Sequence, residues 1–391
     1  MDWSFLIKNK ESLHVTTDSR KVTPGCIFVA LKGEHFDGND FVEQAERDGA
    51  AYIIKGENAL QELQDLARAW RRQLDIPIIA ITGTNGKTTT KELTAAVLGK
   101  RFNVCYTQGN LNNQLGVPLT LLSITRAHEV AIIEMGASHP GDIKELVEIA
   151  EPTCGLITNV GKAHLEGFGS FEGVQKTKAE LYDFLRAHGG FCFRNIDNPY
   201  LEKMAADLKT VEYTTGTLPE GTHLVGGYNA ENVSAAICIG AYFGISREQA
   251  LEAIRAYVPT NNRSQFMQTE RNTVVIDAYN ANPTSMTAAI NAFANSQQPT
   301  ANGQCYILGA MRELGEYSRL EHQNIVNMLL ERKADKVLLV GEEYKQTTAP
   351  YPVFENVEAL CAYLQKEPLS GYSILLKGSR SNQLEKVIPL L

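Results

Sequence analysis

The sequence predicts an α/β protein of three domains: a small N-terminal α/β domain, a central domain built on a parallel sheet with helices on both faces, and a Rossmann-like C-terminal domain. The chain of 391 residues is longer than one hydrophobic core usually supports. Apolar β-branched runs alternate with helical patterns through its middle, and this alternation restarts after residue 258. We therefore expect domains over residues 1–75, 76–258 and 259–391.

The first 75 residues carry the pattern of a small α/β domain. Strands are predicted at residues 26–31 and 50–54, and helices at 40–48 and 60–74. Polar groups lie next to the first strand, namely Asp18-Ser19-Arg20 and Lys32. They are suited to binding an anionic ligand, although solvated loop charges explain the same residues at least as well.

Residues 76–258 show the alternation typical of a parallel sheet between two helical layers. Strands are predicted at residues 78–82, 129–135, 154–159 and 190–195, and helices at 88–100, 141–150, 171–188, 229–243 and 246–257. Open α/β sheets bind ligands at the carboxyl ends of their strands. We expect a binding site at that edge.

The last third of the chain repeats this alternation as a separate unit. Strands are predicted at residues 273–278, 304–308, 336–340 and 372–376, and helices at 283–295, 318–332 and 356–366. The sequence contains no internal repeat and no low-complexity tract. Ligand sites are expected where the domains meet.

Composition limits the classes of partner. The net charge of −8, from 37 basic and 45 acidic residues, argues against nucleic acid or an anionic membrane. Seven scattered cysteines without a C-x-x-C pair indicate reduced thiols and a cytoplasmic protein. The N-terminus lacks the charged and apolar regions of a signal peptide, and no apolar run reaches about 18 residues. We expect neither export nor membrane insertion.

The stretch from Ile78 to Thr90 has the layout of a phosphate-binding loop. An apolar strand leads into Gly83, Thr84, Asn85, Gly86, Lys87, Thr88 and Thr89, which open a helix. Glycines let backbone N–H groups approach an anion, Lys87 adds a full charge, and the Thr88 hydroxyl can bind Mg²⁺. The usual longer pattern requires glycine where Ile81 stands, so the loop is the shorter G-x-x-G-K-T. The central domain is therefore predicted to be P-loop ATPase-like, against the alternative of an ordinary strand-to-helix turn.

Three further residues of the central domain could do chemistry. Glu134 ends an apolar strand, so a parallel neighbour of the loop strand would bring its carboxylate to the phosphate and a Mg²⁺ ion. His164 also follows an apolar strand, but a lone histidine at such a place is more often structural than a ligand. Lys178 lies in a helical pattern and reads, from its spacing alone, as a surface lysine.

The C-terminal part offers a second group of polar residues. In Asn261-Asn262-Arg263, the guanidinium at the domain junction could bind a phosphate. Asp277 ends a strand and could accept the hydroxyl groups of a ribose. Tyr279, Asn280 and Asn282 could bind a peptide-like ligand, whereas turn and helix-cap chemistry before Pro283 explains both asparagines equally simply.

These motifs, in this order, resemble the Mur ligase family and, within it, the MurF type. The motifs are Asp18 to Gly25, Gly83 to Thr89, Gly109 to Pro118, Tyr279 to Pro283, Leu308 to Gly315, and Lys377 to Arg380. They cover nearly the whole chain. The family's own ATP loop is the short form, which explains the missing first glycine.

The resemblance implies a role for each candidate residue. The implied catalytic set is Lys87, Glu134, His164 and Lys178, with Thr88, Glu134, His164 and a CO₂-carbamylated Lys178 as metal ligands. Asn229 and Asn232 match adenine-side residues, and Arg263 and Asp277 match the phosphate and ribose contacts. The implied substrate-binding residues are Asp18, Ser19, Arg20, Lys32, Asn110, Asn112, Asn113, Tyr279, Asn280 and Asn282.

The implied activity is ATP-dependent amide ligation with ATP and Mg²⁺, joining D-alanyl-D-alanine to UDP-N-acetylmuramoyl-tripeptide, by a monomeric protein. Two features depart from the family pattern. Ala310 stands where the family usually has aspartate, and the segment between residues 195 and 228 is short. The alternatives are another Mur-type or folylpolyglutamate synthase-like ligase, or a nucleotide-binding homologue without activity.

Overall fold

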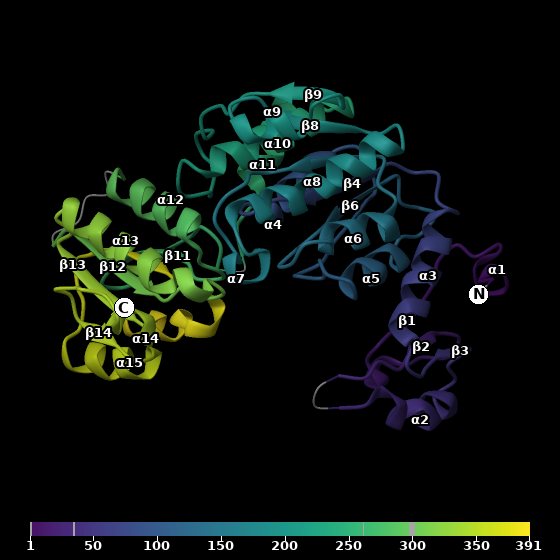
Figure 1. Ribbon diagram of the computed structural model, residues 1–391, viewed down its shortest axis with the longest axis horizontal. Helices are drawn as coiled ribbons and strands as arrows, with labels where there is room; N and C mark the ends of the chain where they lie inside the picture. The colour runs from purple at the N-terminus through teal and green to yellow at the C-terminus, as the bar shows by residue number, and fades with distance from the viewer. Residues whose placement is uncertain (1, 34–35, 261, 297–301) are drawn as a thin grey trace.

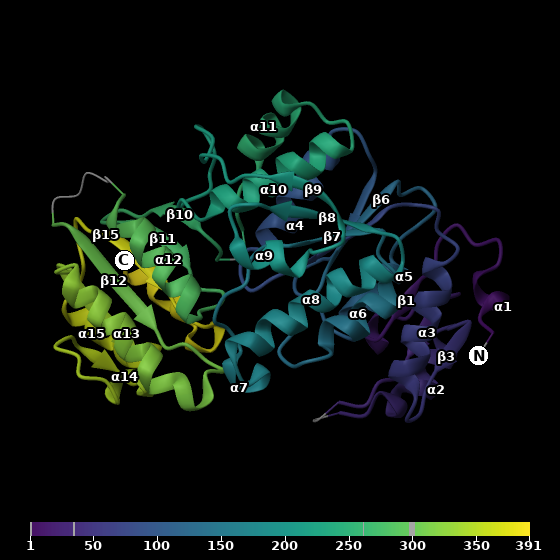
Figure 2. The same ribbon diagram turned by 45° about the horizontal axis from the view of Figure 1, so that its top comes forward.

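The computed structural model describes residues 2–33, 36–260, 262–296 and 302–391. Asn261, at the predicted junction of the second and third domains, lies outside these residues. Three separate sheets form three bodies in a row, with the C-terminal body at the left of Figure 1, the central body in the middle and the N-terminal body at the right. The turned view in Figure 2 keeps this order. Each sheet lies within one predicted domain range, and the boundaries after residues 75 and 258 stay predictions.

The N-terminal body is a three-stranded parallel sheet in the order β1-β2-β3. Its elements are α1 Ser4–Ile7, β1 Val15–Thr16, η1 Ser19–Lys21, β2 Ile27–Val29, η2 Gly38–Phe41, α2 Val42–Arg47 and β3 Tyr52–Ile54. The two predicted strands and the first predicted helix are confirmed in shortened form. The predictions miss β1, because two residues show no periodicity.

Helix α3, Ala59–Arg71, joins the first body to the second and packs against the second. The indole Nε1 of Trp70 donates to the carbonyl oxygen of Ile124 at 2.9 Å. Nε of Arg71 donates to the carbonyl oxygen of Ala150 at 3.1 Å. Both bonds lie in buried surroundings, where a lost partner would be costly. This helix therefore anchors the N-terminal body to the central one.

The central sheet has six parallel strands in the order β5-β6-β4-β7-β8-β9. They are β4 Ile78–Thr82, β5 Val104–Tyr106, β6 Val130–Glu134, β7 Cys154–Ile157, β8 Phe191–Asn195 and β9 Lys209–Tyr213. The four predicted strands are confirmed, and the edge strands β5 and β9 are additional. Strands β6 and β7 lie on opposite sides of β4, so the sheet grows in both directions from it. The carboxyl end of β4 is therefore a topological switch point, the place where open α/β sheets bind ligands.

Helices cover both faces of this sheet, as predicted. They are α4 Lys87–Leu98, α5 Gly116–Leu122, α6 Asp142–Ala150, α7 Leu165–Phe168, α8 Phe171–Ala187, α9 Pro199–Met204, α10 Asn229–Tyr242 and α11 Arg247–Ala256. Ile79 and Ile81 of β4 pack in one core with α4, α10 and α11. Ile78 and Ala80 pack in the other core with α5, α6 and α8. Alternate residues of the strand thus face opposite helical layers. The short segment between residues 195 and 228 contains α9 and β9.

The C-terminal sheet has the order β10-β11-β15-β12-β13-β14, and only the pairing of β10 with β11 is antiparallel among the described strands. The strands are β10 Gln265–Gln268, β11 Thr273–Asp277, β12 Gln304–Gly309, β13 Lys336–Val340, β14 Val353–Phe354 and β15 Ser373–Lys377. The helices are α12 Pro283–Ala294, η3 Gly315–Tyr317, α13 Ser318–Glu331, α14 Glu342–Lys345, α15 Val357–Lys366, η4 Arg380–Asn382 and η5 Leu384–Leu390. All predicted strands and helices of this unit are confirmed. None of the helices in the described ranges is long and apolar enough to cross a bilayer.

Polar contacts join the central and C-terminal bodies. Nζ of Lys162 lies 2.8 Å from Oε1 of Glu321 on α13, and the backbone N–H of Lys162 donates to Oγ1 of Thr284 at 2.9 Å. Glu321 is 5% exposed, so its carboxylate is paired in a shielded position. These contacts bring the carboxyl ends of the two large sheets toward each other.

Candidate active site

The turn between β4 and α4 is a tight backbone loop that requires glycine at two positions. Gly83 and Gly86 have φ values of +142° and +79°. A Cβ on Gly83 would lie 1.9 Å from Oγ1 of Thr158, and one on Gly86 would lie 2.3 Å from Oδ1 of Asn232. Because the backbone can approach its surroundings this closely, the loop has the form of a phosphate cradle at a helix N-terminus.

Lys87 supplies a cation at this loop. Its Nζ donates to the carbonyl oxygens of Gly83 at 2.7 Å and Thr84 at 3.1 Å. The pKa of Lys87 is lowered to about 8, chiefly by burial, which Glu134 partly opposes and to which the charge of Arg263 adds. The ammonium group therefore lies in surroundings poor in water, where its attraction for a phosphate is strong.

The Glu134 carboxylate lies beside the cradle, as predicted from its place at a strand end. Strand β6 pairs parallel with β4, with Glu134 opposite Ile81. Its Oε1 accepts hydrogen bonds from Oγ1 of Thr88 at 3.2 Å and Nδ2 of Asn112 at 2.8 Å. Its Oε2 is buried and has no hydrogen-bond partner within the described parts of the chain. A carboxylate and a hydroxyl next to a phosphate loop form the donor set that suits Mg²⁺, whose other ligands are usually phosphate oxygens and water.

Two asparagines of α10 lie against the other side of the cradle. Nδ2 of Asn229 donates to the carbonyl oxygen of Val225 at 2.7 Å, and Nδ2 of Asn232 donates to Oδ1 of Asn229 at 2.9 Å. Oγ1 of Thr90 donates to Oδ1 of Asn232 at 3.0 Å. This chain of bonds fixes the N-terminus of α10 to that of α4.

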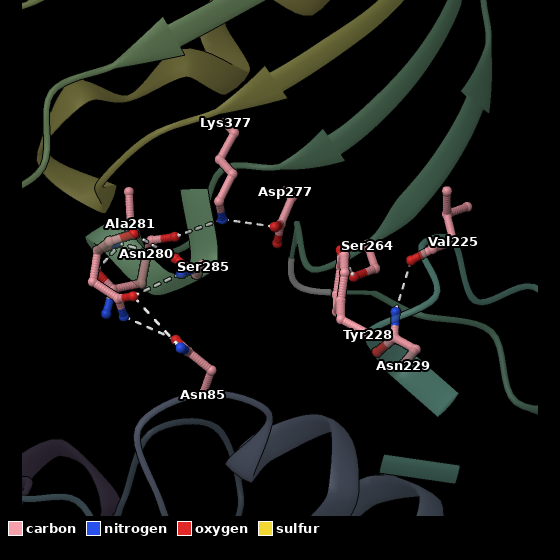
Figure 3. A network of polar contacts seen from close by, with 11 residues as sticks. Asn85, Val225, Tyr228, Asn229, Ser264, Asp277, Asn280, Ala281, Ser285 and Lys377 are labelled. Atoms are coloured by element: carbon pink, nitrogen blue, oxygen red, sulfur yellow. Dashed lines mark hydrogen bonds and ion pairs between the residues drawn. The ribbon is translucent and has the colours of Figure 1, made fainter. Parts of the chain in front are cut away.

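The C-terminal body faces the cradle with a second polar group (Figure 3). Asp277 and Lys377 end the neighbouring strands β11 and β15, and Nζ of Lys377 lies 2.7 Å from Oδ2 of Asp277. The guanidinium of Arg263 lies 3.7 Å from the centre of the Tyr279 ring, a stacking that holds it in place. Acidic and basic groups are thus presented to a ligand bound at the cradle.

One cavity of about 870 Å³ lies between these groups and is lined by both bodies. The predicted residues that line it are Thr84, Asn85, Gly86, Lys87, Thr88, Thr89, Asn110, Asn112, Asn113, Glu134, His164, Asn229, Asn232, Arg263, Asp277, Tyr279 and Asn280. Its volume is that of a site for a nucleotide-sized ligand. The arrangement can hold a triphosphate at the cradle and present its far end to a second substrate.

Family models match the chain along most of its length. The Mur ligase family catalytic domain matches residues 13–98, the Mur ligase middle domain matches residues 81–219, and the Mur ligase glutamate ligase domain matches residues 262–380. Two relatives, from Bacillus subtilis and Escherichia coli, are named UDP-N-acetylmuramoyl-tripeptide–D-alanyl-D-alanine ligase. They are 34% and 33% identical to this chain, over 96% of it and over 92% and 93% of their own lengths.

The chain belongs to the Mur ligase family.

Solved structures of Mur ligases agree with this assignment. The MurF ligase from Thermotoga maritima in complex with ADP is 26% identical, has a TM-score of 0.85 and matches over 98% of both chains. MurF from Acinetobacter baumannii is 28% identical and has a TM-score of 0.84, over 96% of this chain and 92% of its own. The predicted three-domain fold is therefore confirmed.

In this Mur ligase, Lys178 is buried on α8 with 2% exposure, so its interpretation as a surface lysine is wrong. Burial holds the pKa of Lys178 well below the ordinary lysine value, and the charge of Lys87 adds to this lowering. Its Nζ lies 5.5 Å from the centre of the Phe168 ring. Lys178 is not among the described residues that line the cavity.

His164 is held by the other body. Its Nδ1 pairs with the carboxylate of Glu313, and its backbone has a positive φ of 49°. No group of three or more His, Cys, Asp and Glu side chains suited to a metal occurs in the ranges that the structure describes. The predicted metal ligands are thus brought together only in part: Thr88 contacts Glu134, while His164 contacts Glu313.

The predicted N-terminal residues lie on the separate first sheet of this Mur ligase. Nε of Arg20 donates to Oδ1 of Asp18 at 2.8 Å, and the Arg20 side chain is 86% exposed. Ser19 is the first residue of η1, and the backbone of Lys32 pairs with that of Asp37 in an isolated antiparallel β-bridge. Within the described ranges, none of these residues lines the cavity. Their role in binding substrate remains a prediction.

The alternative interpretation of Asn282 as a helix cap is confirmed. Its side chain accepts from the backbone N–H of Ser285 in a capping box at the start of α12, and its Nδ2 donates to Oδ1 of Asn85 at 2.8 Å. Asn280 accepts from the backbone N–H of Ala281 with its side chain, and it also lines the cavity. Its two interpretations therefore both remain open.

Two residues that line the cavity, Lys377 and Tyr228, are given no role by the sequence. Lys377 pairs with Asp277, and Tyr228 lines the cavity with its hydroxyl 2.7 Å from Oγ of Ser264. The signal for Lys377 is its place at the end of an apolar strand, the same signal that identifies Asp277. Ala310, where the sequence departs from the family pattern, is fully buried. A Cβ placed on Gly341 would lie 2.6 Å from the Cβ of Ala310.

Proposed function

We propose that this Mur ligase uses ATP to join D-alanyl-D-alanine to UDP-N-acetylmuramoyl-tripeptide. The single observation that carries the proposal is the shared cavity. In it the cradle, Lys87 and Glu134 of the central body face Arg263 and Asp277 of the C-terminal body. The names of the relatives over nearly the full chain support the choice of substrates.

The proposed reaction has two steps. A carboxylate oxygen of the tripeptide attacks the γ-phosphorus of ATP, the β–γ bridging bond breaks, and ADP leaves an acyl phosphate. The amine of D-alanyl-D-alanine then attacks the acyl carbon, the carbon–oxygen bond to phosphate breaks, and the amine loses a proton. Positioning and charge stabilisation supply most of the catalysis in phosphoryl transfer.

The residues of the cradle hold the triphosphate in this proposal. Backbone N–H groups from Gly83 to Thr88 and the charge of Lys87 face the phosphates. Thr88 and Glu134 would hold Mg²⁺, which neutralises phosphate charge when it is bound. Arg263 presents its guanidinium to the phosphates, and Asp277 accepts the ribose hydroxyls.

Lys178 is proposed to react with CO₂. Its burial and lowered pKa favour the neutral amine, the form that attacks CO₂. A nitrogen–carbon bond forms and a proton leaves, so that a cation becomes an anionic carbamate. This exchange replaces repulsion from Lys87 by attraction, and the carbamate gains a carboxylate-like metal ligand role together with His164.

The remaining substrate contacts are proposed from the resemblance of the sequence motifs to those of the family. Asp18, Ser19, Arg20 and Lys32 are proposed to bind the UDP end on the first sheet. Asn110, Asn112 and Asn113, and across the cavity Tyr279 and Asn280, are proposed to bind the peptide parts. We further propose that the enzyme is a cytoplasmic monomer that acts in peptidoglycan precursor synthesis. Cell shape and cell division would then depend on its activity.

Acceptor choice tests the proposal against other ligases. With ATP, Mg²⁺ and UDP-N-acetylmuramoyl-tripeptide, we expect D-alanyl-D-alanine to support ADP release, and single amino acids or glutamate to give only background release. Turnover with a single amino acid alone would indicate another Mur-type or folylpolyglutamate synthase-like enzyme. Tight ATP binding without phosphate release in the presence of all substrates would indicate an inactive homologue.

A further inference from the structure

Lys91 is a fully buried lysine beside the phosphate site that the proposed reaction does not use. It lies one turn after Lys87 on α4, with 0% exposure. Its Nζ lies 3.7 Å from Oε2 of Glu134 and 3.8 Å from Oε1 of Glu92, and 5.8 Å from the centre of the Tyr106 ring. No hydrogen bond to this Nζ is found within the described residues. A buried ammonium is unfavourable unless neighbouring charges compensate it, so these two carboxylates define its surroundings.

The two oxygens of Glu134 have different neighbours. Oε1 faces the cradle, where Thr88 and Asn112 donate to it. Oε2 faces Lys91 and accepts no hydrogen bond in the described part of the chain. The carboxylate therefore presents Oε1 to the cradle and Oε2 to the buried ammonium of Lys91. At 3.7 Å the contact is longer than a hydrogen bond, so Lys91 attracts Oε2 without occupying its lone pairs.

The position of Lys91 is fixed from outside the phosphate loop. The hydroxyl of Tyr257 donates to Oε2 of Glu92 at 2.5 Å. Tyr257 directly follows α11, which packs against α4. Glu92 is thereby anchored on a second helix, and its other oxygen faces the Lys91 ammonium. Tyr257, Glu92, Lys91 and Glu134 form a continuous polar chain from α11 to the end of β6.

We propose that Lys91 is a positioning residue that orients Glu134 for the divalent cation, with Glu92 and Tyr257 as its support. This inference rests on the proposed cation site at Thr88 and Glu134. A purely electrostatic role would act in the opposite direction, because removing a positive charge next to Glu134 would favour a bound cation. The sign of the effect on cation affinity therefore separates positioning from charge repulsion.

Binding of Mn²⁺, followed by the electron paramagnetic resonance signal of the free ion, tests this with the full chain and ADP and needs no turnover. Lys91→Met keeps a similar length without charge, and we expect Mn²⁺ to bind about tenfold more weakly or worse, as for other residues that orient metal ligands. Metal-free ADP binding should stay within about twofold, since the cradle itself is unchanged. Lys100→Met, which removes a partly exposed lysine paired with Glu252, is the matched control and should bind Mn²⁺ like the wild type.

Equal or tighter Mn²⁺ binding by Lys91→Met would overturn the inference. If that variant fails to fold, Tyr257→Phe decides, because it keeps the ring and removes only the bond to Glu92. We expect this variant to bind Mn²⁺ more weakly than the wild type, with a smaller loss of affinity than in Lys91→Met. An unchanged affinity would overturn the inference. A wild type that binds ADP but no Mn²⁺ would contradict the proposed cation site and the inference together.

Discussion

Replacing Lys87 by alanine is expected to lower kcat/KM for ATP by about 10³-fold or more, a loss of about 4 kcal/mol of transition-state stabilisation. The charge that develops on the transferring phosphoryl group lies at the cradle, and Lys87 is the lysine whose Nζ contacts the cradle carbonyls of Gly83 and Thr84. In a partly desolvated site such a charge acts more strongly than in water. Steady-state ADP release measures the effect, and a loss below about tenfold would remove Lys87 from the catalytic set.

Lys87→Arg is the matched control, because it keeps a charge that does not titrate. Burial lowers the pKa of Lys87 to about 8, so wild-type Lys87 loses its proton as the pH rises through 8. The protonated form binds phosphate, hence ATP affinity measured by calorimetry should fall between pH 7 and 9 in the wild type. The arginine variant should show a flatter profile. The same slope in both proteins would assign the pH dependence to another group.

Replacing Lys178 by alanine is expected to nearly abolish turnover, and added short carboxylic acids should partly restore it. The mutation leaves a buried space on α8 where the carbamate is proposed to stand, and a small carboxylate can supply the missing anion. Activity with and without added acetate or formate measures the rescue. Full activity of Lys178→Ala without any addition would contradict the carbamate role.

Lys176→Ala provides the matched control for this experiment. Lys176 lies two residues earlier on α8 and is exposed, whereas Lys178 is buried. We expect normal turnover and no effect of the added acids. Equal losses in both variants would point to damage to the helix rather than to a missing anion.

The parts of the site that sequence could predict are those set by local pattern. An apolar strand, a glycine turn and a helix start locate the cradle, and Glu134 follows from the rule that parallel strands end at one edge. The same rule finds Asp277. The turn and cap chemistry before Pro283 is also local, and the structure shows it at Asn282.

The parts that sequence could not predict depend on contacts between distant segments. Lys377 meets Asp277 because β15 inserts beside β11, a pairing 100 positions apart that no periodicity reveals. His164 meets Glu313 only through the approach of two bodies. Lys91 resembles any helical lysine until α11 and β6 are placed around it. The strands β5 and β9 are missed because edge strands are short or polar.

The fate of oxygen tests the central claim most directly. UDP-N-acetylmuramoyl-tripeptide carrying ¹⁸O in the carboxylate that becomes the amide is incubated with ATP, Mg²⁺, D-alanyl-D-alanine and the enzyme. Mass spectrometry of the products then follows the label. The account predicts that each amide formed releases one phosphate containing one ¹⁸O atom, because the acyl phosphate carries that oxygen away. Amide formation with unlabelled phosphate, or ADP release without amide, would contradict it.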